Sequence, residues 1–292
     1  MTALAALAIT PAARAWLAAT TTARVLNVFD RACNLVNAEG DVLAVVTSER
    51  GLTPFGLMVA AGERAPFREL TPASAVHGTP DRLWLGPLEI DAAGARLWQP
   101  APDWPAIRRL FAGREALAAL GAQAAGQGPA GSLLELFAPE GPGLALPAAL
   151  RQRAQPAARE LVAGLRAGDV EAAAAGARRL AGLGGGLTPA GDDFILGALL
   201  AVCAGLYGAD VEPFAPGIAA AVATAAAPLT TTLSGAYLRA AGRGECSAYW
   251  HDLCAALLRP EAGGVPDALA ALLAVGHTSG ADALAGFLAV GV

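Results

Sequence analysis

Residues 100–105 read Pro-Ala-Pro-Asp-Trp-Pro, and the pattern of apolar residues changes on either side of this segment. Before it, apolar residues come in short runs broken by turn-forming residues; after it, alanine-rich stretches with helical spacing are separated by glycine and proline. A chain of 292 residues is long enough for about two domains. We therefore predict an α+β fold, with a small, mainly β N-terminal domain over residues 1–102 and a larger all-helical domain over residues 103–292.

The N-terminal part carries the strand pattern. Valine and aromatic residues are frequent in its short apolar runs, as expected of strands. The predicted strands cover residues 25–29, 33–36, 42–47, 55–60, 83–90 and 95–98. Two turn-like segments, residues 38–41 and 91–94, lie between neighbouring runs, so we expect an antiparallel sheet built from hairpins.

The C-terminal part carries the helical pattern. The predicted helices cover residues 104–125, 147–167, 169–183, 189–207, 213–226, 230–241, 247–258, 266–275 and 279–290, with a loop over residues 126–131. Hydrophobic residues make up 55% of the chain but aromatic residues only 5%. Alanine, leucine and glycine therefore supply the apolar surface, which favours close packing of helix against helix.

All 20 Lys+Arg positions are arginine, so the chain contains no lysine. Pyridoxal phosphate (PLP) and biotin are both attached through a lysine amine, and a Walker loop places a lysine on its phosphate, so these chemistries are excluded. An anion must be held by arginine, backbone N–H groups or hydroxyls. A net charge of -5 without a basic block argues against nucleic acid or an anionic membrane as a partner.

Several features predict a cytoplasmic protein. The first ten residues are apolar but no basic residue precedes them, and Arg14 follows instead, which is not typical of a signal peptide. The longest apolar stretch, residues 194–209, is shorter than the roughly 20 residues of a membrane-spanning helix. Four cysteines lie in apolar surroundings without C-x-x-C spacing, as expected of reduced thiols. They are Cys33, Cys203, Cys246 and Cys254.

The segment GLGGGLTPAGDDF at residues 182–194 is the densest candidate for a site. Thr188 is placed to cap a helix with Pro189 in its first position, and such a helix start suits an anion. The glycines Gly184, Gly185 and Gly186 allow a ligand to approach the backbone closely. The spacing does not fit a dinucleotide-binding motif, and no Walker lysine follows the glycines.

The adjacent carboxylates Asp192 and Asp193 are the strongest candidates for chemistry. The helix dipole favours acidic residues in the first turn, which accounts for one of them. Consecutive helical residues point about 100° apart, so the other should face the packed side, where a charge needs a partner. We predict that one of them binds a substrate amide or a divalent cation such as Mg²⁺; pairing with arginine or a backbone donor is the structural alternative.

The segment GHTSGAD at residues 276–282 lies directly before the last predicted helix. Ser279 and Asp282 resemble a capping box, which explains both structurally. His277 and Thr278 have no such explanation, so we consider His277 a proton carrier and Thr278 a hydrogen-bond donor to substrate, against a structural histidine as the alternative. The order G-H-T-S-G is not the G-x-S-x-G of a hydrolase.

A third segment, residues 228–235, reads PLTTTLSG. Thr230 and Ser234 are four residues apart, so we expect their hydroxyls on one helical face, with Thr231 beside them. They could bind a ligand or simply cap the helix, and the sequence favours neither.

Taken in this order, the three segments resemble the AllH-type family, a subunit associated with oxamate carbamoyltransferase of allantoin breakdown, whose other members are labelled putative carboxylases. The match lies in residues 182–194, TTTLS at 230–234 and GHTSGADALAG at 276–286. Cys33-Asn34-Leu35 and Thr53-Pro54-Phe55 are arranged similarly, so the resemblance extends over most of the chain. Where the family usually has a serine, this chain has Ala190, so no hydroxyl role is implied there.

The resemblance implies carbamoyl transfer between an oxamate-like amide and phosphate, with partner subunits or further copies of the chain. The phosphate motif S-T-R-T of well-known carbamoyltransferases is absent. A small anionic substrate would be held by backbone N–H groups and hydroxyls. The candidate catalytic residues are Asp192, Asp193 and His277, and the candidate substrate-binding residues are Gly184, Gly185, Gly186, Thr188, Thr230, Thr231, Ser234, Thr278, Ser279 and Asp282.

Three other functions stay open. The chain could be a non-catalytic binding or scaffold subunit whose polar residues are only helix caps. It could be a metal-assisted hydrolase using Asp192 and Asp193, although few oxygen ligands are visible in the sequence. A carboxylase would have to be biotin-free. No cofactor is required by any pattern in the sequence.

Overall fold

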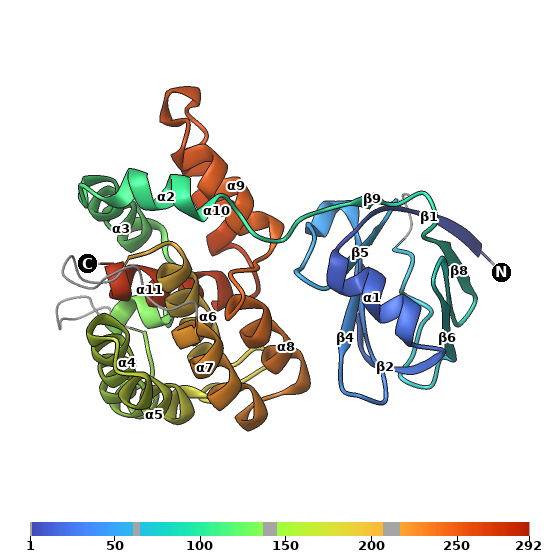
Figure 1. Cartoon of the computed structure of the whole chain (residues 1–292), viewed down its shortest axis with the longest axis horizontal. Helices are drawn as coiled ribbons and strands as arrows, with labels where there is room; N and C mark the ends of the chain where they lie inside the picture. The colour runs from blue at the N-terminus through green and yellow to red at the C-terminus, as the bar shows by residue number, and fades with distance from the viewer. Residues whose placement is uncertain (1, 61–64, 137–144, 207–216, 292) are drawn as a thin grey trace. The chain divides into compact units, whose positions relative to one another are not determined.

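The computed structural model describes residues 2–60, 65–136, 145–206 and 217–291. It divides into two compact units, Met1–Pro100 and Ala101–Val292, and the division falls within the proline-rich segment. Each unit has its own hydrophobic core. Figure 1 shows a β unit with one helix and a unit made of helices, so the α+β class is confirmed.

The first unit is a closed ring of strands. The strand order is β5-β4-β3-β2-β6-β7-β8-β1, and β5 pairs with β1 to close it, while the short β9 also pairs with β1. The strands are β1 (Thr2–Ile9), β2 (Thr22–Phe29), β3 (Ala32–Val36), β4 (Val42–Thr47), β5 (Gly56–Val59), β6 (Val76–Thr79), β7 (Arg82–Leu85), β8 (Leu88–Asp91) and β9 (Arg96–Leu97). One α-helix, α1 (Pro11–Ala19), packs on them.

The ring is not wholly antiparallel, as the sequence had suggested. Strand β1 runs parallel to β8 and β9, and β4 runs parallel to β5. The turn at residues 38–41 joins β3 to β4 as predicted, but residues 91–94 connect two strands that pair with β1 instead of each other. The predicted strand 83–90 is two strands, because Gly86 turns the chain with a φ of +54°.

The second unit is helical. Its α-helices are α2 (Trp104–Phe111), α3 (Glu115–Gln127), α4 (Ala148–Ala167), α5 (Val170–Leu180), α6 (Ala190–Cys203), α7 (Gly217–Ala226), α8 (Thr232–Ala241), α9 (Ala248–Leu257), α10 (Val265–Leu273) and α11 (Ser279–Gly291). Short 3-10 turns lie at η2 (Leu133–Leu136), η3 (Ala227–Leu229) and η4 (Pro260–Ala262). Within the described ranges, no helix has both the length and the hydropathy to cross a bilayer.

Most predicted helices are present with ends shifted by a few residues. The predicted helix 104–125 is two helices, because Arg114 takes a left-handed φ of 58° between α2 and α3. Helix α3 extends to Gln127, into the predicted loop 126–131. Tyr207 and residues 213–216, which two of the predictions included, lie outside the described residues.

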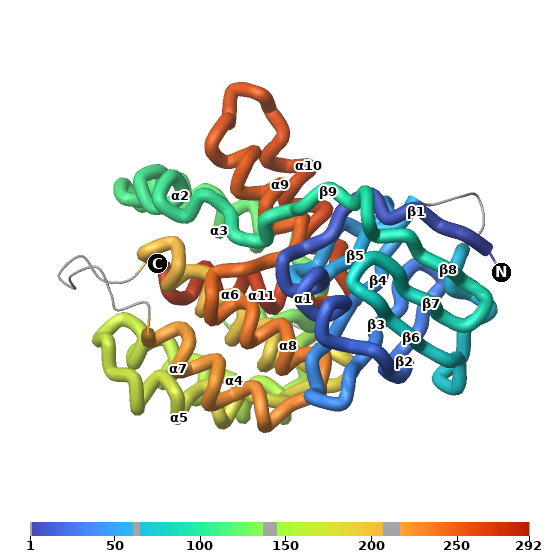
Figure 2. The backbone as a smooth tube through the Cα atoms, turned by 45° about the vertical axis from the view of Figure 1, so that its right-hand side comes forward, coloured from blue at the N-terminus to red at the C-terminus, as the bar shows by residue number. Residues whose placement is uncertain are grey.

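Two pairs of helices are packed backbone against backbone. A Cβ atom added at Gly197 of α6 would lie 1.6 Å from the Ala283 carbonyl oxygen of α11, and one at Gly286 of α11 would lie 1.9 Å from that of Phe194. The same relation joins α4 to α5 through Gly164 and Gly176. Figure 2 shows α6 and α11 together inside the unit, with α4 and α5 side by side. The abundant small residues therefore bring α6 and α11 close together, and both helices begin at the same place.

Candidate functional site

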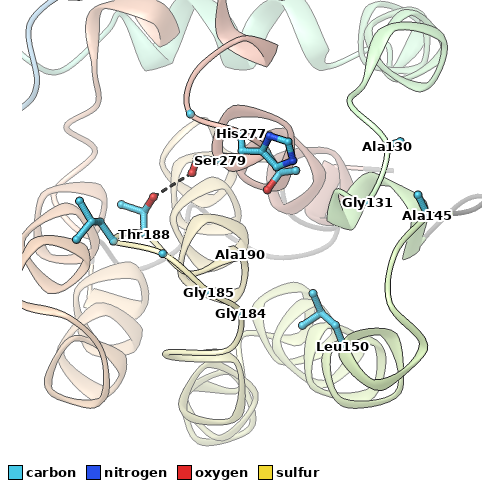
Figure 3. A pocket seen from close by; sticks show the side chains of 14 residues that line it. Ala130, Gly131, Ala145, Leu150, Gly184, Gly185, Thr188, Ala190, His277 and Ser279 are labelled. Carbon is cyan, nitrogen blue, oxygen red and sulfur yellow. Dashed lines mark hydrogen bonds between the residues drawn. The ribbon is translucent and has the colours of Figure 1, made fainter. Parts of the chain in front are cut away.

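The second unit contains a cavity of about 580 Å³ at the starts of α6 and α11. The cavity is formed by three stretches of chain, and Figure 3 shows them around it. Its described lining residues are Ala130, Gly131, Ala145, Leu150, Gly184, Gly185, Gly186, Leu187, Thr188, Ala190, Gly276, His277, Thr278 and Ser279. The size is within the range of sites that hold small molecules, roughly 300–1,000 Å³.

The structure brings the three predicted segments together. Thr188 Oγ1 and Ser279 Oγ lie 2.9 Å apart, which joins the first segment to the second (Figure 3). Thr230 donates a hydrogen bond through its Oγ1 to Asp192 Oδ2, which joins the third segment to the first. Only some of the predicted site residues line the cavity: Gly184, Gly185, Gly186, Thr188, His277, Thr278 and Ser279.

Thr188 is not the helix cap that the sequence predicted. Pro189 occupies the N-cap position of α6, and no side chain caps it. The amides of Asp192 and Asp193 donate to the Pro189 carbonyl, and that of Gly191 donates to the Leu183 carbonyl. The helix start therefore offers few donors to an anion. The Thr188 hydroxyl is instead paired with that of Ser279.

The glycine loop retains unused backbone donors. Within the part of the chain that the structure describes, the amides of Gly184, Gly185 and Gly186 have no acceptor, although all three residues line the cavity. Gly184 has a φ of +118° and Gly186 a φ of +91°, conformations that favour glycine. A series of unpaired amides beside a cavity is a donor arrangement suited to anionic oxygens.

Asp192 lies behind the cavity wall and is 2% exposed. Its Oδ1 accepts a hydrogen bond of 2.8 Å from the Gly182 amide, and its Oδ2 accepts from Thr230. Burial raises its pKa, while hydrogen bonds from Thr230, Gly182 and Ser234 lower it in part. Both oxygens are used to hold the glycine loop to the third segment, so Asp192 positions the loop and does not itself line the cavity.

Asp193 is 7% exposed and has a different environment. Its Oδ2 is buried and has no hydrogen-bond partner among the described residues. Burial raises its pKa well above 3.8; hydrogen bonding by the Ser279 and Thr188 hydroxyls opposes this, and the charges of Asp282 and Asp192 add to it. The two hydroxyls that act on the pKa of Asp193 line the cavity, whereas Asp193 itself does not.

Ser279 and Asp282 do not form the predicted capping box. Ser279 is the first residue of α11, and its hydroxyl pairs with Thr188. Asp282 is fully buried, and its Oδ1 accepts a 2.6 Å hydrogen bond from the Leu133 amide. Burial raises the pKa of Asp282 to about 6, although hydrogen bonds from Leu133 and Thr278 lower it in part. A capping box fails because the helix starts one residue earlier than a Ser279 cap requires, with Ser279 itself in the helix.

The third segment lies behind the cavity wall. Thr230 precedes α8 in an extended conformation, so it does not share a helical face with Ser234, as had been expected. Thr231 is the N-cap of α8, and its Oγ1 accepts from the Ser234 amide and donates to the Leu187 carbonyl. The Ser234 hydroxyl also lies 3.4 Å from that carbonyl. These hydroxyls hold the loop that precedes α6 and do not line the cavity.

One wall of the cavity was not recognised from the sequence. It is formed by Ala130, Gly131, Ala145 and Leu150, which Figure 3 shows opposite Thr188. Glu135 holds this wall, because its Oε1 accepts from the Gly131 amide at 2.6 Å and its Oε2 from the Leu146 amide at 2.7 Å. Burial raises the pKa of Glu135, but these backbone hydrogen bonds bring it below its usual value. The sequence offered only the glycine at Gly131 as a signal, a residue type that suits the positive φ found there.

The three aspartates have no arginine partner among the described residues. The described ion pairs all use glutamates. In the same ranges, no three His, Cys, Asp or Glu side chains form a group that could hold a metal ion. His277, at the exposed edge of the cavity, is the one titratable side chain among its described lining residues.

Comparison with known families gives two matches. The family model of the oxamate carbamoyltransferase subunit AllH matches residues 180–291, which include all three site segments. The model of the AllH family N-terminal domain matches residues 5–97, most of the β unit. No curated protein and no solved structure matches the chain.

Proposed function

Since this chain belongs to the AllH family, we propose that it is a carbamoyltransferase subunit whose cavity binds a small carboxylate or carbamoyl compound of the oxamate type. The observation that carries the proposal is one cavity lined by unpaired amides and by hydroxyls of the first two segments, with the third segment holding the glycine loop from behind. Partner subunits, a role in allantoin catabolism and a cytoplasmic location are parts of the same proposal.

The lining of the cavity matches an amide that also carries a carboxylate. The amides of Gly184, Gly185 and Gly186 are donors for carboxylate or phosphate oxygens. The hydroxyls of Thr188 and Ser279 can both donate and accept, as an amide group requires. No arginine is among the described lining residues, so binding would depend on neutral donors.

The size of the cavity favours two ligands bound together. Oxamate has only six non-hydrogen atoms, so about 580 Å³ leaves room for phosphate or a carbamoyl donor beside it. Transfer between two bound molecules gains from their fixed proximity and orientation. In this proposal His277 exchanges protons at the edge of the cavity and Thr278 orients the substrate.

Binding to the full-length chain tests the proposal. We expect oxamate and phosphate, added singly and together, to raise the melting temperature and to give saturable heats in calorimetry. Thr188→Val and Ser279→Ala should weaken oxamate binding by about tenfold, since each removes one hydrogen bond of roughly 1.4 kcal/mol. The matched control is Thr224→Val, because Thr224 is exposed on α7 and bonds only its own helix.

The scaffold alternative gives a different result. If the chain is a scaffold, it should bind neither ligand but copurify with catalytic subunits. The complex should then stay active when this chain carries Thr188→Val. If the purified complex transfers the carbamoyl group from carbamoyl phosphate to oxamate, and Thr188→Val but not Thr224→Val slows it, the enzymatic proposal stands. A requirement for bicarbonate instead of a carbamoyl donor would indicate a biotin-free carboxylase.

A further inference from the structure

Asp193, Ser279 and Thr188 form a chain of polar groups from the interior of the helical unit to the cavity. Ser279 and Thr188 line the cavity, and their hydroxyl oxygens are 2.9 Å apart. Asp193 does not line it, but hydrogen bonding from both hydroxyls acts on its carboxyl group. These polar groups therefore connect the buried carboxyl group of Asp193 to the cavity, where a ligand can bind.

We propose that Asp193 holds a proton behind the cavity wall and exchanges it, through the Ser279 and Thr188 hydroxyls, with a ligand in the cavity. The inference rests on the proposed function for the identity of that ligand. Asp193 touches no cavity space, so it is a positioning and proton-supplying residue that acts through the two hydroxyls.

The surroundings of Asp193 favour its protonated form. More than nine-tenths of the residue is buried, and no ion pair with a described arginine balances its charge. The titratable groups whose charges act on it are Asp192 on the same helix and Asp282 on α11, both of them acids. Its Oδ2 is buried and has no hydrogen-bond partner among the described residues, so no donor there stabilises the ionised form.

The two neighbouring acids are connected differently, since the cavity hydroxyl that acts on Asp282 is that of Thr278 and not one of the Thr188–Ser279 pair. Both oxygens of Asp192 accept hydrogen bonds, from Gly182 and Thr230, neither of which lines the cavity. Asp282 uses Oδ1 to hold the Leu133 amide. Asp193 is the one of the three whose hydrogen-bonding neighbours include both members of the Thr188–Ser279 pair.

The proton transfer balances within the proposed reaction. When phosphate attacks the carbamoyl carbon, a C–O bond forms and the C–N bond to the leaving amide breaks. The leaving nitrogen gains a proton from a cavity hydroxyl, which is refilled from Asp193. The phosphate hydroxyl releases a proton, which returns along the same chain to Asp193. Either oxygen of the Thr188–Ser279 pair can be the donor, so the chain can carry a proton in both directions.

Infrared spectroscopy of the full-length chain tests proton storage without any activity. At pH 7 we expect a carboxylic-acid C=O band that is lost in Asp193→Asn but kept in Asp252→Asn, because Asp252 is exposed on α9. Ser279→Ala should keep the band and shift it, which serves as a second variant if Asp193→Asn does not fold. Absence of the band at pH 7, or its loss when Mg²⁺ or Na⁺ is added, would overturn the proposal in favour of an ionised or cation-bound Asp193.

Transfer kinetics of the purified complex test the relay itself. Ser279→Ala should lower kcat by about 100-fold, an effect separate from the roughly tenfold weakening of oxamate binding, as for loss of general acid–base catalysis. Carbamoyl donors with a leaving group that needs no proton should be used by this variant at nearly the wild-type rate. Ser247→Ala is the control, because Ser247 precedes α9 and its side chain makes no capping hydrogen bond. An equal fall in the rate of the Ser279→Ala variant with both kinds of carbamoyl donor would refute the relay. A wild-type complex that is inactive with every donor would refute the proposed function but would leave the infrared result unaffected.

Discussion

At the scale of single residues, the adjacent carboxylates have separate roles, because consecutive positions on a helix face different surroundings. Asp192 is held by Gly182 and Thr230 and ties the glycine loop to the start of α8. Asp193 faces the hydroxyls of the cavity wall. The pair therefore combines a structural carboxylate with one that can exchange a proton, and a single substitution separates the two roles.

Thr230→Val should leave Asp192 Oδ2 buried without its donor. We expect the free energy of unfolding to fall by about 1–3 kcal/mol, the cost of an unsatisfied buried acceptor. Thr224→Val, on the exposed side of α7, should change it by less than about 0.5 kcal/mol. Urea denaturation measures both. Equal small effects would show that the Thr230 hydroxyl is not required by Asp192.

The sequence pointed to polar residues that line the cavity but not to their partners, nor to the wall opposite them. Thr188, His277, Thr278 and Ser279 do line the cavity, because loops before helices expose their polar side chains. The Leu133 amide that Asp282 binds is 149 residues away in sequence, a pairing that only the tertiary fold determines. Helix capping is a local rule, and here long-range hydrogen bonds override it.

At the scale of elements, the close pairing of α6 and α11 is what sets the geometry of the site. Gly197→Ala would place a methyl group 1.6 Å from the Ala283 carbonyl oxygen, so the two helices would have to separate. We expect a loss of stability of more than about 3 kcal/mol, or failure to fold. Thermal unfolding followed by circular dichroism measures the effect.

Gly126→Ala on α3 is the matched control, since nothing lies within 4 Å of the added Cβ. Alanine is the better helix former by about 0.5–1 kcal/mol, so this variant should be as stable as the wild type or more so. If Gly197→Ala were equally well tolerated, the backbone-to-backbone contact of α6 with α11 would not be the feature that holds the two helices together.

Helices were easier to predict than strands. The alanine-rich periods of α4 to α11 identify helices locally, and glycine and proline mark their ends. Strand β1 and helix α1 were missed, because Thr2–Ile9 is rich in alanine, a poor strand former, and its alternating burial arises from pairing with β8 and β5. The parallel pairings of β1 with β8 and β9 were missed because they join strands that are distant in sequence, and that of β4 with β5 because a hairpin was assumed between consecutive strands.

At the scale of the whole molecule, the buried acids determine how stability changes with pH. The pKa of Asp282 is about 6 in the fold and 3.8 without it, so between these values the native state binds more protons than the unfolded state. The free energy of unfolding should therefore fall as pH rises from about 4 to 6, by about 3 kcal/mol for this residue. Asp192 and Asp193 act in the same direction.

Urea denaturation at a series of pH values between 4 and 7 checks this, with Asp282→Asn as the informative variant. Asparagine keeps an oxygen for the Leu133 amide but carries no charge, so the fall in stability across this range should become smaller. Glu135, whose pKa lies below its usual value of 4.5, contributes in the opposite sense and at lower pH. A variant with the same pH dependence as the wild type would show that Asp282 is not the titrating group.

The contact between α6 and α11 also has a consequence for local opening of the helical unit. Where two helix backbones touch, no side chain can rotate aside to admit water, so the amides along the contact exchange with deuterium only when the helices part. Residues 194–202 of α6 and 281–290 of α11 should therefore be among the slowest to exchange. The loops that line the cavity, which precede α6 and α11, are thus attached to the slowest-exchanging segments of the helical unit. A ligand would therefore bind to a surface whose shape is already fixed.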